Sequence, residues 1–70
     1  MPRGYDTKSV LKMLLKYSFQ KISQKGSHLK LKNGRNIVIL PLHNKDIPYG
    51  TFCAILQQAG LSHEDAEKYL

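Results

Sequence analysis

Apolar residues recur with a helical period near the start of the chain. They follow the i, i+3, i+4, i+7 spacing of one buried helix face: Val10, Met13, Leu14 and Tyr17. Asp6 or Thr7 is the predicted N-cap, because the short side chain of either residue can accept a hydrogen bond from a free backbone amide. Lys8, Lys12 and Lys16 recur every four residues on the opposite side. The first element is therefore predicted to be an amphipathic helix with a cationic ridge.

Three short strands are predicted after this helix. Residues 19–24 alternate only weakly between apolar and polar positions, whereas residues 27–32 and 35–40 are clearer. Between the last two lies Asn33-Gly34, the strongest short hairpin signal, because a type I′ turn needs positive φ at both central residues. We therefore predict one weak strand followed by a hairpin with a two-residue loop.

The predicted register gives this hairpin two unlike faces. A two-residue loop places Lys32 opposite Arg35 and His28 opposite Ile39. One face carries four aliphatic side chains: Leu29, Leu31, Val38 and Leu40. The other face carries His28, Lys30, Lys32, Arg35, Ile37 and Ile39. We expect the aliphatic face to join the core and the second face to form an open sheet surface.

Two more helices are predicted in the last third of the chain. Pro41 ends the third strand, and residues 42–50 are expected to form a loop. Thr51 is the predicted N-cap of the next helix. The residues that define this helix are Phe52, Ile55, Leu56 and Ala59 at its buried positions and Gly60 at its end. Ser62 and Asp65 resemble a capping box for a short last helix.

This order of elements predicts one small α+β domain over residues 1–70. Its layout is α-β-β-β-α with a short extra C-terminal helix, and a three-stranded antiparallel sheet is covered by helices on one face. A domain of 70 residues buries only about 60% of the surface that its unfolded chain exposes, which excludes a large internal cleft. Any chemistry must therefore use a few groups on an exposed face.

The charge is strongly basic and unevenly distributed. Eleven Lys and Arg against five Asp and Glu give a net charge of +6, and the sequence pI is about 9.7. Residues 1–35 hold nine cations and one acid, for +8, whereas residues 36–70 hold two cations and four acids, for −2. A polyanionic partner is favoured, and the basic half is expected to face nucleic acid.

The sequence favours a cytoplasmic protein with no membrane contact. Cys53 is the single cysteine and cannot form an internal disulfide, which fits a reducing compartment. The longest apolar run, residues 37–40, is far shorter than the roughly 20 residues that a membrane span needs. The polar N-terminal residues show no signal peptide.

The tripeptide Gly26-Ser27-His28 places an imidazole at the mouth of the basic sheet face. An imidazole can take a proton from a ribose 2′-hydroxyl or give one to a leaving oxygen. An exposed strand histidine without a catalytic role has the same spacing, so the tripeptide alone leaves both interpretations open. A nucleophilic dyad of Ser27 and His28 is set aside, because adjacent strand residues point to opposite faces.

Several residues near this tripeptide are candidates for phosphate contacts. The cationic candidates are Lys25, Lys30 and Lys32 on or beside the hairpin and Lys8 and Lys12 on the helix ridge. Gly26 can let the backbone approach a phosphate, although a turn at the strand boundary explains this glycine equally well. Ser27 can contact phosphate or pair locally. Scattered lysines also serve solubility, but a ridge and a hairpin face together favour RNA binding.

No metal or cofactor site is predicted. Four residues carry metal-ligating side chains of the zinc type: His28, His43, His63 and Cys53. They lack the close sequence pairs that structural zinc sites use. His43 either holds its loop by hydrogen bonding or meets the substrate, and the first role is favoured.

Ile37 and Ile39 suggest a protein partner. In the predicted register they lie exposed on an otherwise charged face, and an apolar strip in such a place often marks an interface. A different register or a bulge would instead bury both residues, and this alternative is about as plausible.

Several segments, in the same order over nearly the whole chain, match one protein family. They are Gln24-Lys25-Gly26-Ser27-His28, the Asn-Gly hairpin, Leu40-Pro41-Leu42-His43, Ile47-Pro48-x-Gly50-Thr51 and Ile55-Leu56-x-Gln58-Ala59-Gly60-Leu61. With these segments the chain resembles the HicA (YcfA-like) toxins of bacterial toxin–antitoxin pairs. The resemblance implies a fold like that of the double-stranded-RNA-binding domain and activity as an mRNA interferase.

The resemblance also assigns roles to residues. His28 lies in the Gly-Ser-His segment and becomes the catalytic residue. A HicB antitoxin would cover the active face, with Ile37, Ile39 and His28 in the interface. The expectation is therefore a metal-independent endoribonuclease that cleaves mRNA without a cofactor. The alternative is a non-catalytic RNA-binding module with the same fold.

Overall fold

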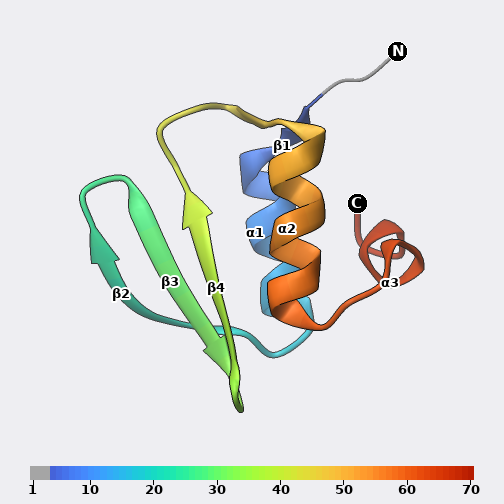
Figure 1. Cartoon of the computed structure of the whole chain (residues 1–70), viewed down its shortest axis with the longest axis horizontal. Helices are drawn as coiled ribbons and strands as arrows, with labels where there is room; N and C mark the ends of the chain where they lie inside the picture. Colours follow the sequence, from blue (N-terminus) through green and yellow to red (C-terminus); the bar gives the residue numbers. More distant parts are fainter. Residues whose placement is uncertain (1–3) are drawn as a thin grey trace.

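The computed structural model describes residues 4–70, so the first three residues of the predicted domain lie outside the described residues. The elements in chain order are β1 (Tyr5–Asp6), α1 (Thr7–Lys16), β2 (Gln20–Lys25), β3 (His28–Asn33), β4 (Asn36–Pro41), β5 (Asp46–Ile47), α2 (Tyr49–Ala59) and α3 (His63–Glu67). The strands β2, β3 and β4 lie side by side in an antiparallel sheet, and β4 is the strand nearest to α2 (Figure 1). The predicted α+β class and the α-β-β-β-α layout are confirmed.

One face of this sheet and the two long helices form the core. The aliphatic side chains of β3 and β4 that were predicted to be buried are buried: Leu29, Leu31, Val38 and Leu40. They pack in one cluster with side chains of α1 and α2, among them Val10, Met13, Leu14, Phe52, Ile55 and Leu56. The period-two pattern of the hairpin and the helical period of α1 and α2 therefore meet at a single apolar interface.

The register of the hairpin differs from the predicted one by two residues. The loop is Gly34-Arg35, and Asn33 pairs with Asn36. Gly34 has a φ of 61°, whereas Arg35 has no positive φ, which fits a type II′ turn rather than the predicted type I′ turn. A shift of two residues leaves every side chain on its predicted face.

The two asparagines of this turn explain the shifted register. The Nδ2 of Asn33 donates a hydrogen bond to the carbonyl oxygen of Tyr17 at 2.9 Å, directly after α1. The Nδ2 of Asn36 donates to the carbonyl oxygen of Ala59 at 3.2 Å, the last residue of α2. Both side chains thus satisfy carbonyl groups that a helix end leaves free, and Asn33 is a strand residue rather than a loop residue.

The segment predicted as a loop between β4 and the second long helix contains more structure than expected. β5 pairs with β1, with Tyr5 opposite Ile47 and Asp6 opposite Asp46. α2 begins at Tyr49 after Pro48, so the predicted N-cap at Thr51 is wrong. The carbonyl oxygen of Pro48 already accepts a hydrogen bond from the amide of Phe52 at 2.9 Å, which places Thr51 inside the first turn.

The remaining helix ends follow the sequence signals. Asp6 caps α1, and Ser62 and Asp65 form a capping box at α3. At the end of α2, Gly60 has a φ of 73° and the amide of Leu61 donates to the carbonyl oxygen of Leu56 at 3.0 Å, as in a Schellman motif. α1 ends in the same way, but there the residue with positive φ is Ser18, at 70°.

Candidate functional site

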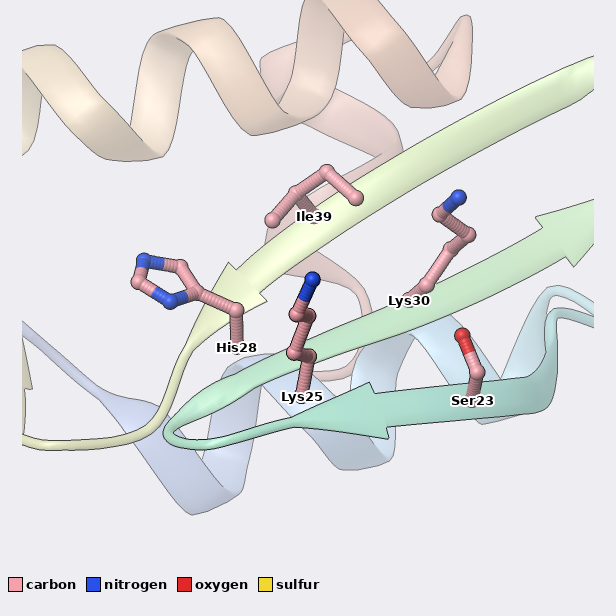
Figure 2. A pocket seen from close by; sticks show the side chains of 5 residues that line it. All are labelled: Ser23, Lys25, His28, Lys30 and Ile39. Atoms are coloured by element: carbon pink, nitrogen blue, oxygen red, sulfur yellow. The ribbon is translucent and has the colours of Figure 1, made fainter.

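A shallow hollow of about 490 Å³ lies on the open face of the sheet, opposite the core. It is lined by Ser23, Lys25, His28, Lys30 and Ile39. Figure 2 shows that these side chains come from β2, β3 and β4 and stand on the same side of the sheet. The hollow brings together four of the predicted site residues: Lys25, His28 and Lys30, which are close in the sequence, and Ile39 from the next strand.

His28 owes its position to a tight turn. Lys25 pairs with His28 across β2 and β3, which leaves Gly26-Ser27 as a two-residue loop. Gly26 has a φ of 59°, and a Cβ added to it would meet nothing within 4 Å. The backbone conformation is therefore what favours glycine at this position. His28 follows as the first residue of β3, where its imidazole is exposed.

The charge of this hollow is positive. Lys25, opposite His28 on β2, and Lys30, further along β3, line the hollow with His28, and no Asp or Glu belongs to the described lining. Ser23 supplies a hydroxyl on the same side. An imidazole that is open to solvent and shares a hollow with two ammonium groups can exchange protons with an anionic ligand held by those ammonium groups.

The other predicted phosphate-binding residues lie further out. Lys32 lines a separate hollow at the turn end of the sheet, together with Gln20 and Ile22. Lys8 lines a third hollow beside the loop of residues 42–45. Lys12 lies one turn further along α1, is exposed, and lines none of these three hollows. None of these three lysines therefore lines the hollow of His28 itself.

Ile37 and Ile39 are exposed, as the predicted faces require. Their exposed fractions are 44% and 37%, and they lie opposite Lys32 and Lys30 on the neighbouring strand. The alternative, in which a different register buries both residues, is therefore wrong. Because Ile39 lines the same hollow as His28, an apolar surface adjoins the imidazole directly.

Two residues on β2 were missed by the sequence reasoning. The pairing of β2 with β3 shifts between Lys21 and Ser23, so Ile22 is an extra residue in a β-bulge. The bulge breaks the period of two, which explains the weak alternation in this segment. As a result Ser23 reaches the hollow beside His28, and Ile22 is an exposed apolar side chain.

A second histidine also lies close to His28. The ring of His43 is 6.4 Å from the ring of His28, measured between centroids, and the two planes are inclined by 49°. His43 lines the third hollow, of about 400 Å³, with Asp6, Thr7, Lys8, Leu42, Asn44 and Lys45. The two hollows therefore adjoin at a pair of imidazoles.

The loop that carries His43 is fixed on both sides. The amide of Leu42 donates to the carbonyl oxygen of Ser27 at 2.6 Å, which ties the loop to the residue before His28. On the other side, the hydroxyl of Thr7 donates to the carbonyl oxygen of Asn44 at 2.7 Å, and the amide of Thr7 donates to that of Lys45 at 2.8 Å. Bonds to the loop backbone, one of them from the Thr7 hydroxyl, rather than a bond from the imidazole, hold this loop.

A comparison with models of protein families gives one match. The model described as the HicA toxin of bacterial toxin–antitoxin systems matches residues 7–61, more than half of the chain. The chain belongs to the HicA toxin family. The predicted family is thereby confirmed, and membership implies an antitoxin as the partner of this toxin. No curated protein matches the chain.

The third histidine of this HicA-family chain lies in a different cluster. The Sγ of Cys53 is 3.8 Å from the Nε2 of His63, and the rings of Tyr49 and His63 stack with centroids 5.9 Å apart. A hydrogen bond with Cys53 raises the pKa of Tyr49. Among residues 4–70, no group of three or more His, Cys, Asp or Glu comes together as a metal site requires. No described helix is long and apolar enough to span a membrane.

Proposed function

We propose that the toxin is a metal-independent endoribonuclease, an mRNA interferase, with His28 as a catalytic residue. The observation that carries the proposal is the exposed imidazole of His28 on the open sheet face, where it lines one hollow with Lys25 and Lys30. This site needs no deep cleft, because a single-stranded RNA can lie across an open sheet with its phosphates against the ammonium groups.

The proposed chemistry uses proton transfer. The imidazole of His28 takes a proton from the 2′-hydroxyl of the substrate or gives one to the leaving oxygen, and one such group contributes about 10²- to 10⁴-fold. The ammonium groups of Lys25 and Lys30 stabilise the negative charge that develops on the phosphorus oxygens. The turn residues Gly26 and Ser27, which directly precede His28, are proposed to contact the same phosphate.

We further propose that lysines outside the hollow of His28 bind the RNA strand on two sides of that hollow. Lys32 extends the basic surface along β3, and Lys8 and Lys12 extend it along α1 beyond His43. Each phosphate that is neutralised on a single strand adds about −0.7 to the slope of log affinity against log salt. Binding is expected to weaken steeply with salt.

The antitoxin is proposed to be of the HicB type and to cover this face. Ile37 and Ile39 form an exposed apolar strip beside His28, and Ile39 lines the hollow of His28. A protein that buries Ile39 therefore also blocks the imidazole. Inhibition follows from occlusion and requires no change in the fold of the toxin.

The test is incubation of the purified chain with mRNA in the presence of EDTA. We expect the wild-type chain to cleave and His28→Ala to leave the RNA intact, while His63→Ala, at a histidine outside the site, cleaves like the wild type. If the wild-type chain left the RNA intact, the proposed nuclease function would be wrong. If that chain still bound the RNA, the alternative of a non-catalytic RNA-binding module would replace it.

A further inference from the structure

We propose that His43 is the second catalytic proton-transfer group of this site. The inference rests on the proposed ribonuclease function and adds a residue to it. Cleavage of RNA by its own 2′-hydroxyl needs one group that removes a proton and another that supplies one, and a single imidazole performs only one of these tasks in each step.

The distance between the two rings fits such a pair. At 6.4 Å between centroids, the imidazoles of His28 and His43 are not hydrogen-bonded to each other. A proton-transfer group must come within about 2.6–3.2 Å of the atom that it serves. One phosphodiester between the rings can therefore meet His28 on one side and His43 on the other.

The ring of His43 is free for this task. Three hydrogen bonds of the loop backbone hold residues 42–45, one with the backbone of Ser27 and two with the amide and the hydroxyl of Thr7. The imidazole itself forms no hydrogen bond with residues 4–70 and is exposed to solvent. The loop is anchored, whereas its imidazole is left unpartnered, which is what a group that must exchange protons with substrate requires.

Charged groups on both sides of the pair favour a continuous path for RNA. Lys25 of β2 and Lys30 of β3 line the hollow beside His28. The hollow beside His43 is lined by Lys8 of α1, Lys45 of the same loop and Asp6 of β1. Four lysines and one aspartate therefore line the two hollows that hold the imidazoles, so the phosphates before and after the cleaved bond can both meet cations.

The reaction balances with these two groups alone. One imidazole takes the proton of the 2′-hydroxyl while the 2′-oxygen forms a bond to phosphorus. The bond from phosphorus to the 5′-oxygen breaks, and the other imidazole, initially protonated, gives its proton to that oxygen. The products are a 2′,3′-cyclic phosphate and a 5′-hydroxyl, and no water, metal or oxidant is consumed.

The first experiment compares single histidine variants at several pH values with EDTA present. We expect His43→Ala to lower kcat by about 10²-fold or more, the effect also expected of His28→Ala, with little change in KM. The pH profile of the wild type should be bell-shaped, and His43→Ala should lose one of its two limbs. His63→Ala is the matched control, since His63 contacts Cys53 outside the site.

A second substrate separates proton donation from mere positioning. In an RNA whose cleaved bond carries sulfur in place of the 5′-oxygen, the leaving thiolate needs no proton. This substrate should restore the rate of the variant that lacks the acid, either His43→Ala or His28→Ala, and should leave the other variant slow. Equal rates for His43→Ala and wild type, or rescue of neither variant, would overturn the role of His43 while leaving His28 in place. A wild-type chain that cleaves no RNA would overturn the proposed function and this inference with it.

Discussion

The two faces of the hairpin β3–β4 are built from alternate residues of the same strands, yet they serve different purposes. Leu29, Leu31, Val38 and Leu40 are buried against the helices, while His28, Lys30, Ile37 and Ile39 are exposed on the opposite side. Stability therefore depends on one set of side chains, and the proposed activity depends on the other. Side chains of the open face can in this way be substituted without loss of the core.

The largest expected effect on stability comes from the buried face. Leu31 is fully buried, so Leu31→Ala should lower the free energy of unfolding by about 2–5 kcal/mol. The neighbouring open-face variant Lys30→Ala should change it by less than about 0.5 kcal/mol. Urea titration of both variants measures the difference. Equal losses would show that the two faces are not separable.

Next in size is the effect of the open-face lysines on RNA affinity. The double variant Lys25→Ala/Lys30→Ala should bind RNA more weakly and should reduce the salt slope of log affinity by about 1.4 in magnitude, since each phosphate contact contributes about 0.7. Lys68→Ala, at an exposed residue next to the last helix, is the control. The measurement is the RNA affinity of the wild type and of both variants at several salt concentrations. An unchanged slope in the double variant would place the RNA elsewhere.

A third effect concerns the antitoxin rather than RNA. Ile39→Glu puts a carboxylate into the exposed apolar strip, so the antitoxin should bind this variant more weakly and fail to inhibit it. Growth arrest should then persist when both proteins are expressed. Ile22→Glu, at the bulge of β2, tests a more exposed isoleucine that lies outside the hollow of His28. Co-purification of the antitoxin with each variant measures the loss of binding. Full complex formation by Ile39→Glu would remove Ile39 from the interface.

The smallest expected effect is on the pH dependence of stability, and it arises at the start of α1, away from the open face of the sheet. The backbone hydrogen bond from Ser9, followed by the bond from its side chain, lowers the pKa of Asp6 at the start of α1. A lowered pKa stabilises the fold above the unfolded value of about 3.9, and this contribution is lost as pH falls through the folded value. Asn can also cap the helix but does not ionise. The Tm of wild type should exceed that of Asp6→Asn near neutral pH, and the difference should shrink below about pH 4. A difference independent of pH would contradict this cause.

The sequence was sufficient for the faces of the sheet but not for its exact turn. Alternation with a period of two placed Leu31 in the core and Ile39 on the surface even though the predicted register was shifted, because a shift of two residues preserves the faces. The predicted turn was wrong because the side chains of Asn33 and Asn36 form hydrogen bonds with the ends of α1 and α2. Such contacts between distant segments leave no periodic signal in the sequence.

The same reason explains why the site was only partly predicted. The cations and the histidine of the hairpin lie within a few residues of one another, so Lys25, His28 and Lys30 could be grouped from the sequence. His43 meets His28 only because Leu42 and Lys45 are bonded to Ser27 and Thr7, contacts that the sequence pattern does not show. Its ring therefore could not be placed beside His28 before the fold was known.

The most direct measurement is the initial rate at which wild-type toxin and His28→Ala cleave the same mRNA in EDTA, with equal folding confirmed by their thermal unfolding. A catalytic imidazole on the open face predicts a rate at least about 10²-fold lower for His28→Ala, with an unchanged Tm. Equal cleavage rates for the two proteins would contradict the assignment of this face as the active site.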